Sequence, residues 1–374
     1  MMPTQTLRQP AVTAARPKDT LARRQRFYGW LLGSPAFFGL ALFILVPFVM
    51  AIVLSFTNQR LLSPNATEMV GLRNYDRLLA VTWLTQDAQR DEAGAILRAA
   101  DGAPEFERLR TLLRANPDYR DYSELASFTL AESRLVLLAK DPLFIKSFGN
   151  TLKFAFMVIP LQCGAALLLA LLVNLGLRGT NFFRTAYFAP VVTSMVVVSI
   201  VWTFLYHKDT GLINEFLKTL SFGLIGDIDW LGSPAWSMPA IVVMSAWQGA
   251  GYQMLIFLAG LQNIPEDLYE AASLDGANGW QKFWHITLPG LRNTTIFVVI
   301  STTIAAFGLF TQVDVMTAGG PADSTSTVMY HAVRKGFREQ DIGYGATISV
   351  IYFLVILAIA LGQKYYFDKR EKQA

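Results

Sequence analysis

Charge and cysteine are both scarce in this chain. Only 16% of its 374 residues are charged, whereas globular domains carry about a quarter, and its mean hydropathy is +0.35. This balance predicts a membrane protein. Cys163 is the one cysteine, so the chain has no intrachain disulfide, and its apolar neighbours indicate a packing role. The formal net charge of +4 is too small to favour a nucleic acid as partner.

Sequence signals of catalysis are missing too. There is no GxxxxGK[ST] phosphate loop, so we expect no bound ATP and no other cofactor in this chain. The histidines His207, His285 and His331 fall in segments on both membrane faces, so we expect surface or interfacial side chains and no metal site. No Ser/His/Asp arrangement or pair of carboxylates has a supporting context. The sequence therefore predicts a non-catalytic protein without catalytic residues.

Long uncharged runs dominate the chain, and each is long enough to cross a bilayer, which takes about 20 residues. The first transmembrane helix is expected within residues 27–56, from Trp30 to Phe56, with a bend near Pro47. We predict an all-α polytopic membrane protein with six transmembrane helices. The other five runs are Phe154–Leu177, Thr185–Tyr206, Trp230–Pro265 (of which about Pro239–Leu261 spans), Asn293–Val313 and Ile342–Gln363.

The distribution of Lys and Arg predicts the orientation. Fourteen lie in the tails and short loops on the side of the N-terminus, and five lie in the short loops on the other side. Since cytoplasmic flanks carry the excess of basic residues, both termini are expected in the cytoplasm. Residues 1–26 and 367–374 are then cytoplasmic tails, and residues 150–366 form a core with five of the spans.

The first outer loop, residues 57–149, is too long for that charge rule and nearly balanced, with 12 basic and 13 acidic residues. Its segments Gln86–Ala100, Glu105–Ala115 and Tyr122–Lys140 predict short amphipathic helices. We therefore expect a small helical insertion on the outer face, at about residues 81–140. Contact with a soluble partner on that face and mere decoration of the face both stay open as its role.

A polar stretch, residues 262–292, separates the fourth and fifth spans and predicts a helical hairpin. Pro265 suits a first helical turn, Gly276 ends that helix, and Asn278-Gly279 permits a turn. Trp280–Ile286 predicts a second helix that ends before Pro289. Such a hairpin is either a handle for a soluble partner or a solvated loop.

The hairpin contains the pattern Glu270-Ala271-Ala272, Asp275-Gly276-Ala277, Phe283, Ile286 and Leu288-Pro289. This pattern resembles the EAA loop of binding-protein-dependent ABC importer permeases, closest to the maltose-type branch for carbohydrates. In that family the loop is cytoplasmic and its helix docks on an ATPase subunit. The resemblance implies an ATPase-docking element of Glu270, Ala271, Ala272, Asp275 and Gly276.

The same resemblance implies the partners and the compartment. They are a cytoplasmic ATPase dimer that binds ATP and Mg²⁺, a second homologous permease (usually a heterodimer), a periplasmic solute-binding protein and the lipid of a bacterial inner membrane. One departure is clear. The family's Gly-Leu-x-Asn-Tyr and Asp-Pro-x-Phe motifs are nearly adjacent, whereas here Gly71–Tyr75 and Asp141–Phe144 are separated by the insertion.

A path for a sugar needs hydroxyl, amide and aromatic groups without fixed charge. The fourth and fifth spans supply six candidates for solute binding: Gln248, Tyr252, Gln253, Thr302, Phe307 and Gln312. Packing between helices is the alternative role for such residues. A neutral sugar, a polyol and an acidic sugar derivative are all compatible. An ion-coupled carrier is disfavoured because no carboxylate or base lies within the six runs, and a non-transporting membrane adaptor is the remaining alternative.

Overall fold

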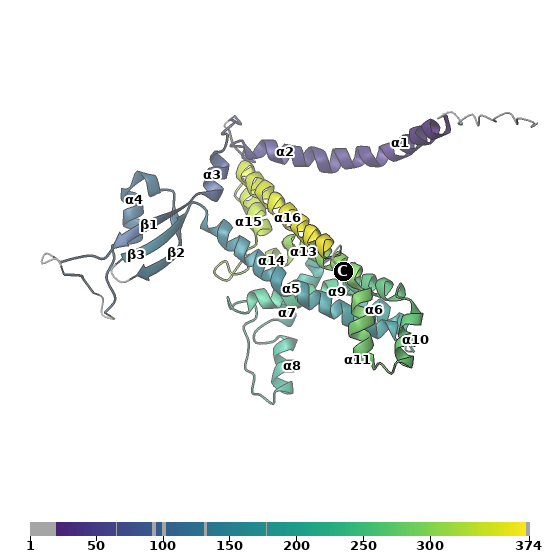
Figure 1. Cartoon of the computed structure of the whole chain (residues 1–374). Coiled ribbons are helices and arrows are strands. Elements are labelled where there is room, and N and C mark those ends of the chain that lie inside the picture. Colours follow the sequence, from purple (N-terminus) through teal and green to yellow (C-terminus); the bar gives the residue numbers. More distant parts are fainter. Residues whose placement is uncertain are drawn as a thin grey trace, which may run out of the picture. The chain divides into compact units, whose positions relative to one another are not determined.

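A computed structural model describes residues 20–371, except residues 65, 92–94, 99–101, 131–132 and 177. Most of the two predicted cytoplasmic tails lies outside these residues. The chain divides into two compact units, Met1–Ala51 and Ile52–Ala374, and each is described by itself. Figure 1 labels the elements.

The first unit contains helix α1 (Thr20–Leu40) and the π-helical turn η1 (Ala41–Leu45), and helix α2 (Val46–Ser55) continues from it. Together Arg24–Ser55 form the first candidate membrane span. The irregularity expected near Pro47 is the π turn directly before it. Proline lacks an N–H and its ring crowds the carbonyl one turn earlier, and a wider turn relieves both problems.

Three further helices are long and apolar enough to cross a membrane, namely α5 (Pro142–Asn174), α9 (Ser237–Gln262) and the first part of α16 (Ile342–Glu371). Two helix pairs pass the same test only together. One is α6 (Thr180–Val192) with α7 (Met195–Leu205), bent by 100°, and the other is Gly279–Gly290 with α13 (Arg292–Phe307), bent by 66°. The described residues thus hold four candidate spans, or six if each bent pair counts as one, and the run Thr185–Tyr206 is not one straight helix.

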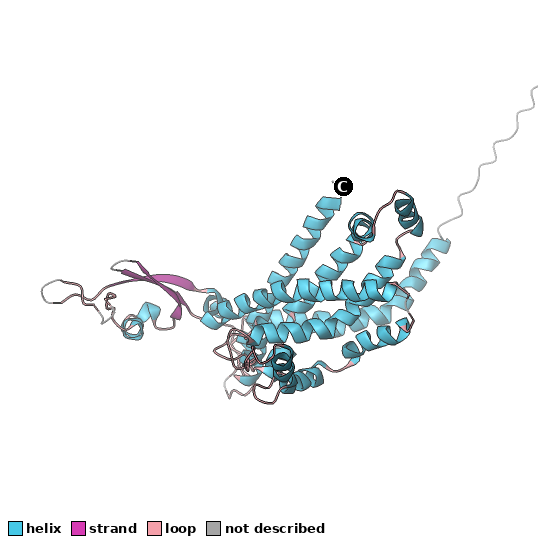
Figure 2. Ribbon diagram, turned by 90° about the horizontal axis from the view of Figure 1, so that it is seen from below, coloured by secondary structure: helices cyan, strands magenta, loops and turns pink. Residues whose placement is uncertain are grey.

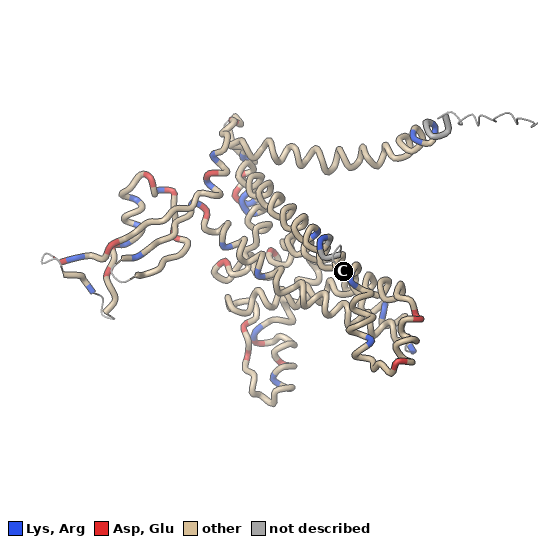
Figure 3. Tube along the Cα trace, viewed as in Figure 1, with Lys and Arg blue, Asp and Glu red and all other residues tan. Residues whose placement is uncertain are grey.

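Helix α9 is central, with residues of both main hydrophobic clusters along it, and it packs against α5, α6 and α13. Several of the long helices lie side by side (Figure 2). Close approach to α6 depends on Gly251, because a Cβ there would lie 2.1 Å from the carbonyl oxygen of Tyr187. Charged side chains are sparse along these long helices and gather in the loops and at the ends (Figure 3). The helical class of the core is therefore confirmed.

Shorter elements connect the spans. They are α3 (Arg73–Leu79), α8 (Leu212–Leu220), α10 (Glu266–Leu274), α11 (Gly279–Lys282), the π turn η3 (Phe283–Thr287), α12 (Leu288–Gly290), α14 (Thr311–Met316), α15 (Val328–Val333) and the π turn η4 (Arg334–Arg338).

The insertion differs from its prediction. It contains an antiparallel sheet in the order β1-β3-β2, with β1 (Val81–Asp87), β2 (Ser123–Leu130) and β3 (Ser133–Ala139). Helix α4 (Leu109–Ala115) brings Leu113 against Val136 and Leu138 on one face of that sheet (Figure 1).

The described residues of Gln86–Ala100 and Tyr122–Lys140 contain strands and loops but no helix, so the helices expected there are wrong for that part of the chain, and Glu105–Ala115 is helical only from Leu109. The reason is that a short apolar run such as Leu135–Ala139 fits a buried central strand as well as a helix.

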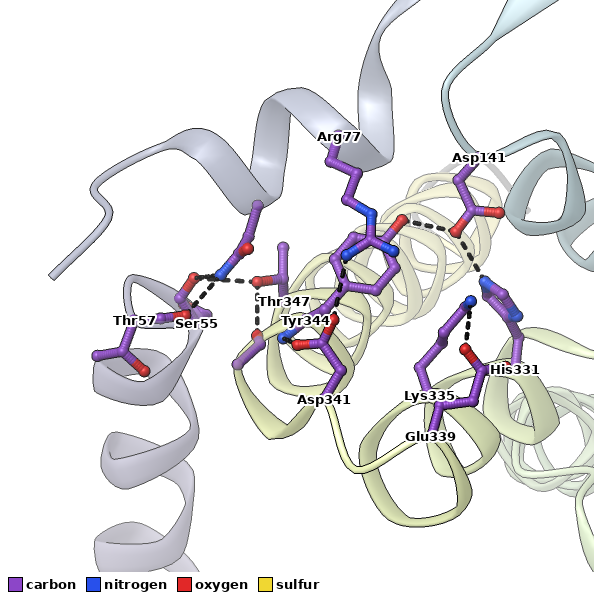
Figure 4. Close-up of polar contacts among 12 residues, drawn as sticks. Ser55, Thr57, Arg77, Asp141, His331, Lys335, Glu339, Asp341, Tyr344 and Thr347 are labelled. Atoms are coloured by element: carbon purple, nitrogen blue, oxygen red, sulfur yellow. Dashed lines mark hydrogen bonds and ion pairs between the residues drawn. The ribbon is translucent and has the colours of Figure 1, made fainter. Parts of the chain in front are cut away.

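A buried polar junction holds the elements after the insertion together (Figure 4). Asp141 caps α5 by accepting from the Phe144 N–H at 3.0 Å, and its other oxygen accepts from His331 Nε2 at 2.8 Å and from Tyr344 Oη at 2.6 Å. Burial favours a higher pKa for Asp141, but these hydrogen bonds and the charge of His331 outweigh burial and hold the pKa at about 2.

The expected surface position of His331 is therefore wrong. Its side chain is 0% exposed, on α15, next to a carboxylate 190 residues away in the sequence. Among the described residues, no group of three or more His, Cys, Asp or Glu is arranged to hold a metal ion.

Candidate functional site

The polar stretch forms a helical hairpin between α9 and α13. Pro265 caps α10 from the position before its first residue, one place earlier than expected, and Glu266 and Asp267 lie in the first turn, where a carboxylate is favoured. Gly276 ends the helix with φ of +77°, a conformation that glycine adopts without strain. The Ala277 N–H then bonds to the Ala272 carbonyl at 2.8 Å, as in a Schellman C-cap.

The second arm starts with a capping box. Asn278 Oδ1 accepts from the Gln281 N–H at 2.9 Å, and Gln281 Oε1 accepts from the Asn278 N–H at 2.8 Å. The helix expected to end before Pro289 continues to Gly290, so that boundary is wrong. The π turn η3 precedes Pro289 and provides room for its ring.

Side-chain contacts join the two arms. Tyr269 Oη and Thr287 Oγ1 are hydrogen-bonded at 2.9 Å, and Lys282 Nζ donates to Ser273 Oγ at 2.6 Å. On the second arm, the rings of Trp280, Phe283 and Trp284 contact one another with centroids 5.6–5.9 Å apart. The hairpin is therefore a braced unit that can transmit a displacement to both helices to which it is connected.

The side chains expected to dock a partner lie on the accessible side of α10. Glu270, Ala271, Asp275 and Gly276 are exposed, and Ala272 is half-buried. Leu274, which sequence reasoning did not select, is 90% exposed at the end of the helix. The signal that could have identified Leu274 is its place as a large apolar residue within a polar stretch. Burial of such a side chain against a partner is energetically favourable.

A cavity of about 320 Å³ lies among α5, α6, α7, α9 and α13. Five of the six predicted solute-binding residues line it. They are Gln248, Tyr252, Gln253, Thr302 and Gln312. The sixth, Phe307, does not: its ring is buried against Tyr352, and its carbonyl accepts from Tyr352 Oη at 2.6 Å.

The lining of this cavity is uncharged, and its amides and hydroxyls are interspersed with apolar side chains such as Phe154 and Met195. Gln162, Ser245 and Ser301 add an amide and two hydroxyls that the predicted set lacked, and no Asp, Glu, Lys or Arg is among the lining residues. Gln253 donates through Nε2 to Thr302 Oγ1, while its buried Oε1 has no hydrogen-bond partner. A solute hydroxyl can donate a hydrogen bond to this amide oxygen. A charged solute would find no counter-ion among the lining residues, so its burial in the cavity would be costly. Gln162, an amide in the middle of the apolar run of α5, was the available signal.

The family model described as "Binding-protein-dependent transport system inner membrane component" matches residues 162–373. The lactose transport system permease protein LacF of Rhizobium radiobacter is 36% identical over 244 residues, which cover 64% of this chain and 80% of LacF. The probable ABC transporter permease protein YurN of Bacillus subtilis is 32% identical over 240 residues, covering 64% and 82%. The sn-glycerol-3-phosphate transport system permease protein UgpA of Agrobacterium fabrum is 34% identical over 231 residues, covering 62% and 78%.

A solved structure shares the fold. It is a bacterial ABC transporter involved in the import of the acidic polysaccharide alginate, with a TM-score of 0.64 and 17% identity over 93% of this chain and 97% of that one. The chain belongs to the family of binding-protein-dependent transport system inner membrane components.

Proposed function

We propose that this permease subunit of an ABC importer moves a sugar or sugar-like solute across the inner membrane by alternating access. Its relatives include permeases named for lactose, arabinooligosaccharides and sn-glycerol-3-phosphate. The cavity lined by amides, hydroxyls and Tyr252 supports a polyhydroxylated cargo, because such groups exchange hydrogen bonds with sugar hydroxyls. Gln248, Tyr252, Gln253, Thr302 and Gln312 are the residues we assign to solute contact.

The observation that carries the proposal is the braced hairpin with its exposed α10 surface. We assign Glu270, Ala271, Ala272, Asp275 and Gly276, with Leu274, to the contact with a separate ATPase subunit in the cytoplasm. Closure of an ATPase dimer around ATP and Mg²⁺ would displace the hairpin. The contacts between Tyr269 and Thr287 and between Lys282 and Ser273 would pass that displacement to α9 and α13, which line the cavity.

The remaining partners follow from the same scheme. A periplasmic solute-binding protein delivers the solute to the outer face, and a second, homologous permease completes the pore. Both termini of this chain lie in the cytoplasm, in line with the excess of Lys and Arg on that side. In this scheme the separate ATPase subunit hydrolyses ATP, while this chain binds the solute and changes conformation.

Reconstitution separates this function from the alternatives. Proteoliposomes that contain this chain, its companion permease, the ATPase and the binding protein should take up labelled disaccharide only when ATP is present on the ATPase side. Uptake driven by an ion gradient without ATP would instead indicate a secondary carrier. ATPase binding without any uptake would indicate an adaptor.

A further inference from the structure

A second cavity, of about 590 Å³, lies apart from the solute cavity and shares no lining residue with it. Its walls come from the segment after the first span, from α3, from the base of the insertion and from the start of α16 (Figure 4 shows part of this wall). All of these segments belong to the predicted outer face. Seven of its lining residues are charged: Arg60, Arg73, Arg77 and Lys140 are basic, and Asp76, Asp121 and Asp341 are acidic.

The charges of this cavity do not cancel. Lys140 pairs with Asp76 at 2.5 Å, and Arg77 pairs with Asp341 at 3.1 Å. The hydrogen bond that Lys140 donates to Asp76 raises the pKa of Lys140, so that ammonium group stays charged. Within the described part of the chain, Arg60 and Arg73 form no ion pair. Two guanidinium groups are thus left for one remaining carboxylate, that of Asp121.

The wall that carries these charges is fixed to the helices. Asn74 donates to the carbonyls of Ser55 and Thr57, both at 2.9 Å, which holds α3 against the end of the first span. The Arg77 guanidinium lies 4.0 Å from the ring centroid of Tyr344, and that tyrosine donates to Asp141 (Figure 4). An occupant of the cavity therefore contacts a surface that connects, through Asp141, to His331 on α15 and to the first turn of α16.

We infer that this cavity receives an acidic side chain of the extracytoplasmic solute-binding protein. The inference rests on the proposed function, in which that protein docks on the outer face. Charge complementarity selects the occupant, because an unpaired guanidinium binds a carboxylate through two parallel hydrogen bonds. A protein is favoured over the solute because the cavity lies outside the uncharged path formed by α5, α9 and α13.

The test is a titration of the reconstituted complex with the purified, solute-loaded binding protein of the same transport system, with ATP hydrolysis as the readout. The double variant Arg60→Glu/Arg73→Glu should raise the half-maximal concentration of binding protein about tenfold, because like charges then face each other. Arg60→Lys/Arg73→Lys keeps the charge and should recover most of the affinity. Arg114→Glu, an exposed reversal on α4 outside the cavity, should leave the titration unchanged.

The outcomes are distinct. Co-elution of the double variant with the ATPase verifies that it assembles. If wild type responds to the binding protein and the double variant responds at the same concentration, the inference is wrong and the proposed function stands. If wild type does not respond at all, both are wrong. If calorimetry detects inorganic phosphate bound by wild type and lost in the double variant, with the protein titration unmoved, the cavity is a free-anion site and the inference is overturned.

Discussion

Tyr269 Oη lies 2.9 Å from Thr287 Oγ1, so helix α10 and the arm that leads into α13 are joined by a part-buried hydrogen bond. The buried Thr287 belongs to the π turn η3, directly before Pro289. A force applied to α10 thus reaches the start of α13 through a side-chain contact as well as through the chain.

Tyr269→Phe removes that hydrogen bond and little else. The loss of about 1 kcal/mol should loosen the hairpin, so that ATP hydrolysis continues while less solute moves per ATP. The measurement is the ratio of uptake to hydrolysis in proteoliposomes. Tyr365→Phe, on the exposed end of α16, is the matched control and should not change the ratio. An unchanged ratio for Tyr269→Phe would mean that the contact has no role in coupling.

Glu270→Lys reverses a charge on the exposed face of α10. It should abolish uptake and prevent co-purification of the ATPase, because a charge in contact with its partner becomes repulsive on reversal. Glu105→Lys makes the same change on an exposed residue of the insertion and should leave ATPase binding intact. Normal recruitment and uptake by Glu270→Lys would refute the docking role.

Gln253→Leu tests the solute cavity. The substitution preserves volume but removes an amide that a sugar hydroxyl can reach, a change that costs about 1–3 kcal/mol at a buried polar contact. We expect the uptake rate to fall about tenfold or more while the binding protein still stimulates ATP hydrolysis. Gln363→Leu is the control, because Gln363 bonds to Thr303 at 3.2 Å outside the cavity. Equal effects of the two variants would indicate that both glutamines serve helix packing.

Asp141→Asn tests the buried junction through pH. The pKa of Asp141 is lowered from 3.8 to about 2, so its ionised form stabilises the folded protein above about pH 4 and this contribution is lost as pH falls towards 2. The difference in unfolding free energy between wild type and Asp141→Asn should be about 2 kcal/mol near neutral pH and shrink below pH 4. Thermal unfolding in detergent from pH 7 to pH 3 measures it. A difference that does not change with pH would contradict the assignment, and exposed Asp209→Asn should show no difference.

Sequence patterns predicted the parts of this molecule that depend on local order. Uncharged runs of more than 20 residues identified the candidate spans, and the residues around Glu270 predicted the helical hairpin. Five of the residues that line the cavity were selected because polar groups are conspicuous in apolar helices. Phe307 lies outside the cavity because helical periodicity does not say whether a face meets a cavity or a neighbour such as Tyr352.

Features that depend on contacts between residues far apart in the sequence could not be predicted. His331 is buried through its contact with Asp141, and nothing near either residue in the sequence indicates their pairing. Strand β3 was missed because its run Leu135–Ala139 is apolar without interruption, so the strand shows no alternation. The helix that continues to Gly290 depends on a π turn, which has no local sequence signature.

The most direct measurement is thiol labelling of the hairpin. In a Cys163→Ser background, Leu274→Cys provides a single thiol at the position of the most exposed apolar residue of α10. A membrane-impermeant maleimide should label it in inside-out vesicles but not in intact cells, and bound ATPase should protect it. Labelling from the outside of intact cells would contradict the account, because the hairpin would then lie on the wrong side of the membrane to contact an ATPase.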